Sequence, residues 1–438
     1  MMVSVKSTLL QTIAAVLATA AIALCTGCSR DETTAVTDNR TAICFSPAVS
    51  RHHGHTRSVA QIDESSFNAF DVWAFGSNNT TDDRWDMGID AQTGFQISRG
   101  STYGVIPEIV DGRTDIWGYT NISQLSYWPF DGSRQMQFYA LAPSTSLAGN
   151  LEVKGMELNM TRASHSFTYA PPETHNADGT YRHDDQRDII VAGNNVDLNS
   201  LVTVGQTLPR MTVPLMFHPA LSQIVFDAQL ETNVRNFKVV IKSITLCNIF
   251  IKSTCTILSD GTPSWTGLQR GSVTLTPGGT AGVTLETSDG VNFTTSCGGG
   301  LLSTTKVPLS NGTAANHTDD NIMVLPQTVI PWATTGSQPM ALPDDGTEQA
   351  YLKIVCDITL NGHDLIGTDM VYVPLRVQTV EGMASGTTDT AWLAGYKYTY
   401  TLTFGLGFDA EGRLNGTPIT FAVTASSDWT QHTGDVNL

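Results

Sequence analysis

Residues 396–404 constrain the fold more than any other stretch, because their apolar side chains recur at every second position. The opposite face of this stretch carries Lys397 and three threonines. Such alternation is typical of a strand with one buried face and one solvated face. No long stretch repeats apolar residues at helical spacing, and the 38 glycines favour short strands joined by turns. The sequence therefore predicts an all-β fold. The apolar face consists of Tyr396, Tyr398, Tyr400, Leu402 and Phe404.

Other strands are expected along the whole chain. Asn361-Gly362 is expected to turn residues 352–360 back toward 370–375, because this dipeptide suits a tight hairpin turn. Residues 144–187 are polar and rich in His and Asp, and are expected to be mainly loops. The remaining predicted strands are 70–75, 127–130, 136–143, 188–192, 213–228, 237–248 and 322–327.

The length of 438 residues exceeds the usual size of a single core. Both halves of the chain contain short strands separated by polar loops, so two β-sandwich domains in tandem are expected. We place the N-terminal domain at 58–209, with a connector at 194–209, and the C-terminal domain at 210–438.

Residues 1–27 are interpreted as a secretory signal with a single Lys and an apolar core. The end of the signal and the next residue, Thr26-Gly27-Cys28, resemble a bacterial lipobox, and lipidation of Cys28 is favoured over simple cleavage. The acidic residues Asp31 and Glu32 resemble the tract that directs such lipoproteins to the outer face of the outer membrane.

Residues 28–57 combine the lipidated end with a strand that could be removed. Ile43 and Phe45 alternate as in a strand, and a Gly- and His-rich basic segment ending in Arg57 follows. Exposed basic segments of this kind are accessible to proteases, so cleavage is expected after Arg57. Arg51 and Arg40 are the secondary sites.

Near the C-terminus, residues 417–438 repeat the alternation of the first strand. Ile419, Phe421 and Val423 would lie on one face of an extended strand. This segment is the candidate donor strand, which would fill in a neighbouring subunit the groove left by Ile43 and Phe45.

Five cysteines remain outside the signal and the lipobox, so they cannot all pair within the chain. Buried free thiols are favoured, and a bridge between Cys247 and Cys255 across a hairpin is left open. The five are Cys44, Cys247, Cys255, Cys297 and Cys356.

No catalytic, metal or cofactor site is expected, and the chain is not interpreted as an enzyme. The formal charge of −17 disfavours nucleic acid as a partner. The group His52-His53-Gly54-His55 suits an exposed linker better than a metal site. His218 is expected to be structural. Asp184, Asp185 and Asp188, near His183, are expected in an exposed acidic loop.

Four aromatic residues in Gly-, Asp- and Ser-rich surroundings could stack on sugars, although core packing explains them equally well. They are Tyr103, Trp117, Tyr119 and Trp265.

Several motifs occur together and in order, and through them the chain resembles the fimbrillin family of Bacteroidetes (type V) fimbrial subunits. The resemblance implies transthyretin-like β-sandwiches, lipoprotein export, removal of the first strand after an Arg, and polymerisation by strand exchange. The motifs are Ile43-x-Phe45 with Thr56-Arg57, Tyr127-Trp128-Pro129, 138–143, 188–192, 217–222, Leu325-Pro326-Gln327, Gly395-Tyr396-x-Tyr398-x-Tyr400 and Asp428-Trp429.

The expected function is therefore a structural subunit of cell-surface fimbriae that supports adhesion. Its expected partners are other fimbrial subunits, outer-membrane lipid through Cys28, and a host or bacterial surface ligand. The alternative is a surface lipoprotein that does not polymerise and binds glycan or another ligand through its loops.

Overall fold

A computed structural model describes the parts of the chain given at the end of this paragraph. Most of the described residues lie in strands, so the predicted all-β fold is confirmed. Within these ranges, the only helix is the three-residue 3-10 helix η1 (Ile122–Gln124), and no helix there could cross a membrane. The described residues are 42–49, 67–76, 94–104, 116–128, 135–144, 153, 155–171, 187–197, 212–230, 236–277, 282–287, 293–295, 300–301, 307–309, 322–332, 342–375, 377, 391–404 and 419–426.

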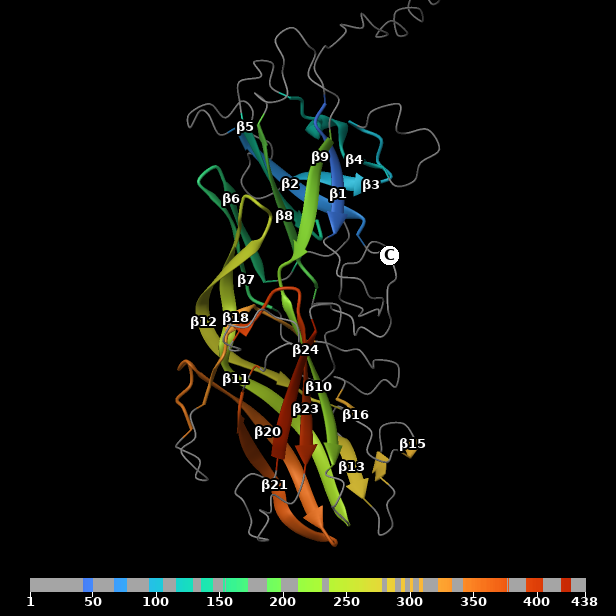
Figure 1. The fold of residues 1–438 in the computed structure, drawn as a ribbon, viewed down its shortest axis with the longest axis vertical. Coiled ribbons are helices and arrows are strands. Elements are labelled where there is room, and N and C mark those ends of the chain that lie inside the picture. Colours follow the sequence, from blue (N-terminus) through green and yellow to red (C-terminus); the bar gives the residue numbers. More distant parts are fainter. Residues whose placement is uncertain are drawn as a thin grey trace, which may run out of the picture. The chain divides into compact units, whose positions relative to one another are not determined.

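A seven-stranded sheet contains the first strand of the described chain. Its order is β1-β9-β8-β5-β2-β3-β4, so strands that are far apart in the sequence become neighbours. Figure 1 shows β1 beside β9. The strands are β1 (Cys44–Val49), β9 (Thr212–Pro219), β8 (Ile190–Asp197), β5 (Gln135–Ala142), β2 (Ala69–Gly76), β3 (Phe95–Arg99) and β4 (Trp117–Tyr119).

Both faces of this sheet are covered by apolar side chains. Phe70, Val72 and Ala74 of β2 lie in one cluster, here called the first core. Trp73 and Phe75, on the opposite face of the same strand, lie in a second core. Because successive side chains of a strand point to opposite faces, all eight residues of β2 are buried.

A ten-stranded sheet has the longest described strand, β11 (Phe237–Ile257), near its centre. The path is β15-β14-β13-β11-β20-β19, with β12, β21 and the hairpin β6-β7 attached to it. The other strands are β15 (Gly300–Leu301), β14 (Phe293–Thr295), β13 (Val283–Thr287), β20 (Gln349–Leu360), β19 (Ile330–Pro331), β12 (Pro263–Leu275), β21 (His363–Pro374), β6 (Met156–Thr161) and β7 (Ser164–Tyr169).

A five-stranded sheet has the order β16-β10-β23-β24, with β17 also paired to β10, and β10, β23 and β24 lie side by side in Figure 1. Side chains of β10 and β23 and of β11, β20 and β21 form a third core between this sheet and the ten-stranded one. Two stacked sheets with apolar inner faces are a β-sandwich. The further strands are β16 (Val307–Pro308), β10 (Ser222–Leu230), β23 (Lys397–Phe404), β24 (Ile419–Ser426), β17 (Ile322–Val324), and the separate pair β18 (Gln327–Thr328) and β22 (Ala391–Trp392).

β11 takes part in two of the cores. Its first half pairs with β20 as far as Cys247, and residues 253–256 pair with β7. Asn248, with a φ of +61°, lies between these halves at a break in the register with β12. Ile241 accordingly lies in the third core and Cys255 in the second.

The predicted hairpin after β20 is confirmed. Asn361 and Gly362 have φ angles of +50° and +76°, as a two-residue turn with left-handed residues requires. β21 begins directly after the turn, at His363, and so is longer than the predicted strand at 370–375.

The structure departs in part from three expectations about loops and strands. Residues 144–187 contain the β6-β7 hairpin, whose Met160 and Phe167 are buried in the second core. Of the predicted strand 127–130, only residues 127 and 128 are described, and Tyr127 forms an isolated bridge to Ala42 there instead of part of a strand. The expected connector at 194–209 begins inside β8, which extends to Asp197.

Sheet membership changes between β9 and β10, which are separated by Ala220 and Leu221. β9 belongs to the seven-stranded sheet although it follows residue 209, and β10 belongs to the five-stranded sheet. The division into domains at 209/210 stays a prediction.

Candidate functional site: the slot of the first strand

β1 is an edge strand of the seven-stranded sheet, and it runs parallel to β9 with Cys44 opposite Thr212 and Val49 opposite Phe217. Parallel neighbours cannot be joined by a short turn, so this pairing depends on the tertiary fold. Ser46 is exposed, whereas Phe45 is buried.

The ring of Phe45 anchors β1 in the first core. Its centroid lies 6.1 Å from that of Phe70, 6.0 Å from that of Tyr119 and 6.0 Å from that of Phe138. All three contacts are edge-on, which is a favourable geometry for aromatic pairs. Ile43 belongs to the same cluster. Full burial of each of these two side chains stabilises the fold by roughly 1.5–3 kcal/mol.

The place that β1 occupies beside β9 is here called the slot. On the side away from β9, the slot is bordered by Gly104, Tyr119 and Ser126. The backbone N–H of Ile43 donates to the carbonyl oxygen of Ser126 at 2.9 Å, and the Tyr119 hydroxyl donates to the carbonyl oxygen of Ile43 at 3.1 Å. The Cys44 thiol donates to the carbonyl oxygen of Gly104. β1 thus pairs with β9 along its length, whereas on the other side only Ile43 and the Cys44 thiol are bonded to residues near β4.

Burial raises the pKa of Tyr119 well above its usual value, with a smaller contribution from the nearby Cys44. The hydroxyl therefore keeps its proton at neutral pH and remains a hydrogen-bond donor. The slot therefore holds β1 by apolar burial, backbone pairing and hydrogen bonds to neutral groups.

The predicted donor residues lie in β24. Ile419 is opposite Phe404, Phe421 opposite Leu402, and Val423 opposite Tyr400, all in antiparallel register with β23 of the same chain. Among the described strands, β24 has no partner other than β23, and it forms an edge of its sheet. Hence the structure does not bring the predicted donor residues together with Ile43 and Phe45.

Several predicted sites lie outside the described residues. These are Cys28, Arg40, Arg51, Arg57, His52, His53, His55, His183, Asp184, Asp185 and Cys297.

The described cysteines Cys44, Cys247, Cys255 and Cys356 are buried free thiols, as expected. The alternative bridge between Cys247 and Cys255 is wrong. Both residues lie on β11, eight positions apart, which is about 26 Å along a strand, whereas a disulfide needs Cα atoms within about 7 Å. Burial raises the pKa of the Cys247 thiol.

Asp188 does not lie in an exposed loop, because it is only 1% exposed. His218 is half-buried, and burial lowers its pKa while the Asp260 carboxylate acts in the opposite direction. No group of three or more His, Cys, Asp or Glu residues suited to a metal occurs in the part of the chain that the structure describes.

Of the four aromatic residues considered for sugar stacking, only Tyr103 is exposed, at 45%. Tyr119 is in the first core, and Trp117 packs against it, 4.8 Å from the ring of Phe67. The Trp265 indole donates to the carbonyl oxygen of Ala220 at 2.7 Å.

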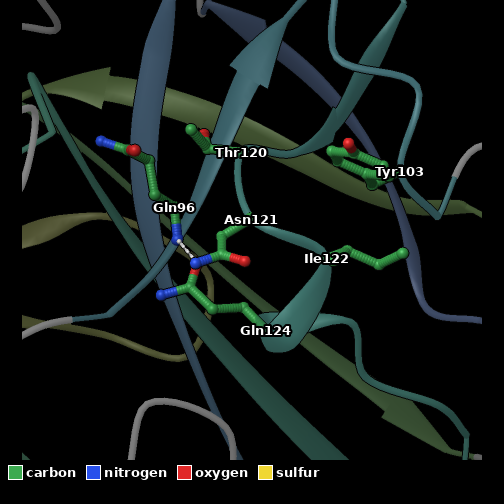
Figure 2. A pocket seen from close by; sticks show the side chains of 6 residues that line it. All are labelled: Gln96, Tyr103, Thr120, Asn121, Ile122 and Gln124. Carbon is green, nitrogen blue, oxygen red and sulfur yellow. Dashed lines mark hydrogen bonds between the residues drawn. The ribbon is translucent and has the colours of Figure 1, made fainter.

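Tyr103 borders a pocket of about 410 Å³, shown in Figure 2. Sequence reasoning found Tyr103 and missed the other lining residues, because they come from two segments that only the fold brings beside Tyr103. They are Gln96, Thr120, Asn121, Ile122 and Gln124.

Comparison with known proteins gives structural likenesses alone. No protein-family profile and no curated protein matches the sequence. A proposed cell adhesion protein from Bacteroides eggerthii is 14% identical, with 88% of this chain and 95% of that one covered and a TM-score of 0.41. A proposed cell adhesion protein from Bacteroides uniformis is 13% identical, with 90% and 100% covered and a TM-score of 0.37. The C-terminally truncated tip fimbrial protein Mfa3 from Porphyromonas gingivalis is 9% identical, with 81% and 93% covered and a TM-score of 0.36. Identities this low do not transfer a function.

Proposed function

We propose that the chain is a structural subunit of a cell-surface fimbria, exported as a lipoprotein through Cys28 and polymerised by strand exchange. The observation that carries this proposal is the slot of β1, in which Ile43 and Phe45 are buried and the backbone pairs with β9. Other fimbrial subunits are its partners, at the outer membrane and the cell surface.

Loss of β1 would leave the edge of β9 without its strand and would expose the apolar groove that held Phe45. An incoming strand with apolar residues at every second position would pair with the edge of β9 through its backbone donors and acceptors. Its apolar side chains would fill the groove. Cleavage after Arg57 would separate β1 from the rest of the chain. The cut β1 would still have to leave the slot before a donor could enter.

The donor in this proposal is the segment 417–438 with Ile419, Phe421 and Val423. β24 pairs with β23 along eight residues of each strand. Donation to a neighbour therefore requires β24 to leave its own sheet first. The free energy lost with the β23-β24 pairing must be offset by the free energy gained when β24 fills the neighbour's slot.

A disulfide lock tests the donor. Thr403 and Thr420 are directly opposite in the β23-β24 register, so cysteines at these positions are close enough to be bridged. Oxidised Thr403→Cys/Thr420→Cys subunits, processed at Arg57, should not polymerise, and reduction should restore assembly. Each single variant is the control. Polymerisation of the oxidised chain at the normal rate would exclude β24 as the donor.

Two further measurements test export and processing. Labelled palmitate should enter the natural chain and should not enter Cys28→Ala. The N-terminal sequence of subunits from assembled fibres should begin at Ser58. Fibres whose subunits still start at Cys28 would contradict removal of the first strand.

The alternative function is a surface lipoprotein that does not polymerise and that binds a ligand through its loops. The pocket beside Tyr103 favours this alternative. A chain that remains monomeric after cleavage at Arg57 and binds a ligand would support it.

A further inference from the structure

The pocket beside Tyr103 lies where β3, β4 and η1 meet. Gln96 belongs to β3, Thr120 and Asn121 follow β4, and Ile122 and Gln124 belong to η1. Its volume of about 410 Å³ falls in the range of small-molecule sites, about 300–1,000 Å³.

The pocket has an apolar side and a polar side. In Figure 2 the ring of Tyr103 and the aliphatic side chain of Ile122 lie on one side, and the amides of Gln96, Asn121 and Gln124 lie on the other. Ile122 is 61% exposed, more than any other large apolar residue in the described part of the chain. None of the six lining side chains is charged at neutral pH.

Two amide groups on the polar side are held by bonds to their oxygens. The Asn121 side-chain oxygen accepts from the backbone N–H of Ser123 at 3.0 Å, and the Gln124 side-chain oxygen accepts from the backbone N–H of Gln96 at 3.2 Å. Neither NH₂ group has a hydrogen-bond partner among the described residues. Because these bonds fix each amide in advance, a ligand loses less free energy in ordering them.

The Gln96 side chain is held by two buried hydrogen bonds in series, through Ser144 to Asp71. Its Nε2 donates to the Ser144 hydroxyl at 2.7 Å, and that hydroxyl donates to the Asp71 carboxylate. These bonds hold the Gln96 side chain in place. Gln96 is 7% exposed and Asp71 is fully buried, so the polar wall is a built part of the fold.

The position of Tyr103 is also fixed by its neighbours. Its carbonyl oxygen accepts from the backbone N–H of Tyr119 at 2.9 Å. Gly104, the next residue, has a φ of +78°, and a Cβ there would lie 2.8 Å from Leu125 and Tyr119 side-chain atoms. Gly104 therefore lets the chain pass close to β4 and η1.

From this geometry we infer that the pocket binds a neutral pyranose sugar, either free or as a residue of a glycan. A pyranose has an apolar C–H face that stacks on an aromatic ring, and hydroxyl groups around its rim that both accept and donate hydrogen bonds. Tyr103 and Ile122 suit the face, and the Asn121 and Gln124 amides suit the hydroxyls. The absence of a cation among the lining residues disfavours phosphorylated and acidic sugars.

The inference does not depend on assembly, because all of the lining residues precede β5 and none belongs to β1 or β24. The disulfide lock in the β23-β24 pair should leave sugar binding unchanged, and pocket variants should leave polymerisation unchanged. Failure of one proposal is therefore distinguishable from failure of the other.

Saturation-transfer NMR on the full secreted chain tests the inference. The probes are the neutral sugars glucose, galactose, mannose and N-acetylglucosamine, with glucose 6-phosphate and N-acetylneuraminic acid as charged comparators. At least one neutral probe should receive saturation from the protein, and it should do so more strongly than either charged probe.

Substitutions then place the binding in the pocket. Tyr103→Ala and Gln124→Leu should each weaken binding about tenfold, whereas Tyr103→Phe keeps the ring and should bind within about threefold of the natural chain. The matched control is Leu268→Ala, which truncates an exposed apolar side chain on β12. Circular dichroism and Tm establish that each variant is folded.

Three results would overturn the inference. These are the absence of transfer to every neutral probe, a stronger signal from a charged probe, and equal binding by Tyr103→Ala and the natural chain.

Discussion

The hydroxyl of Tyr119 donates a 3.1 Å hydrogen bond to the carbonyl oxygen of Ile43, and it thereby links the two ends of the seven-stranded sheet. Tyr119 ends β4, the last strand in the sheet order, and Ile43 directly precedes β1, the first. Both side chains are 1% exposed. The slot of the first strand is therefore closed by a bond that water does not reach.

Tyr119→Phe should destabilise the chain by about 1–2 kcal/mol, because it removes this buried bond while leaving the aromatic packing in place. Urea unfolding followed by tryptophan fluorescence measures the loss. The control is Tyr103→Phe, since the Tyr103 hydroxyl makes no hydrogen bond within the described residues. Equal stability of the two variants would mean that the bond to Ile43 does not contribute.

Phe45→Ala should cost about 3–5 kcal/mol, because it removes the ring that touches Phe70, Tyr119 and Phe138. Val49→Ala, at the half-buried end of the same strand, should cost clearly less. Thermal unfolding of the uncleaved chain provides the comparison. If the two variants have the same Tm, Phe45 does not anchor β1.

Asn248→Asp should destabilise the fold by about 2–4 kcal/mol. The Asn248 side-chain nitrogen lies 3.1 Å from three acceptors, namely the carbonyl oxygens of Asp344 and Gln349 and the hydroxyl of Thr347. A carboxylate cannot donate to them, and it would place a negative charge beside two carbonyl oxygens. Aspartate, like asparagine, tolerates a positive φ, so backbone strain should not add to the measured loss of stability.

Asn236→Asp is the matched control for this prediction. Asn236 also has a positive φ, of +50°, but within the described residues its exposed amide donates to a single acceptor, the side chain of Asn361. A loss of less than about 1 kcal/mol is expected there. Comparable losses in both variants, measured by urea unfolding, would contradict a special role for Asn248.

Stability should fall as the pH rises above about 10. Burial raises the pKa of Tyr398 to about 12 and also raises that of Tyr400, whereas an unfolded tyrosine titrates near 10. Between these values the unfolded chain binds fewer protons than the folded chain, so unfolding becomes easier with increasing pH. Each such tyrosine contributes up to about 1.4 kcal/mol per pH unit.

Urea titrations between neutral pH and pH 11 measure this slope. Tyr398→Phe should lower the stability at all pH values, because it removes the bond to the carbonyl oxygen of Ala391, but it should make the alkaline slope shallower. Phe404→Leu should lower the stability without changing the slope. An unchanged slope in Tyr398→Phe would exclude this tyrosine as a source of the pH dependence.

The strands with the most regular alternation could be predicted from the sequence. β23 and β20 bury the apolar residues of their predicted inner faces, although Thr401 and Tyr351 are buried as well, and the Asn361-Gly362 turn followed from its two residue types. In contrast, β11 was expected to end at Asn248. Asparagine is common in turns, and here it has the left-handed backbone of one, but the strand resumes after a bulge.

The missed hairpin and pocket have different causes. The alternation of Met156 and Met160 with polar residues was present in the sequence, within a polar region that was interpreted as loop. The pocket left no such signal. It depends on the register that places Ile97 of β3 opposite Tyr119 of β4, and that register is a property of the folded chain.

The single strand β11 also determines how the chain carries tension. It is hydrogen-bonded on both sides in each half, to β20 and β13 or β12 before Asn248, and to β7 and β12 after it. A pull applied to the second core reaches the third through the peptide bonds of one continuous strand rather than through a flexible loop. Pulling along β11 would load its neighbouring strand pairs in shear, so many hydrogen bonds would have to break together. Under tension, strands at the edges of the sheets should therefore detach before the second and third cores separate from each other.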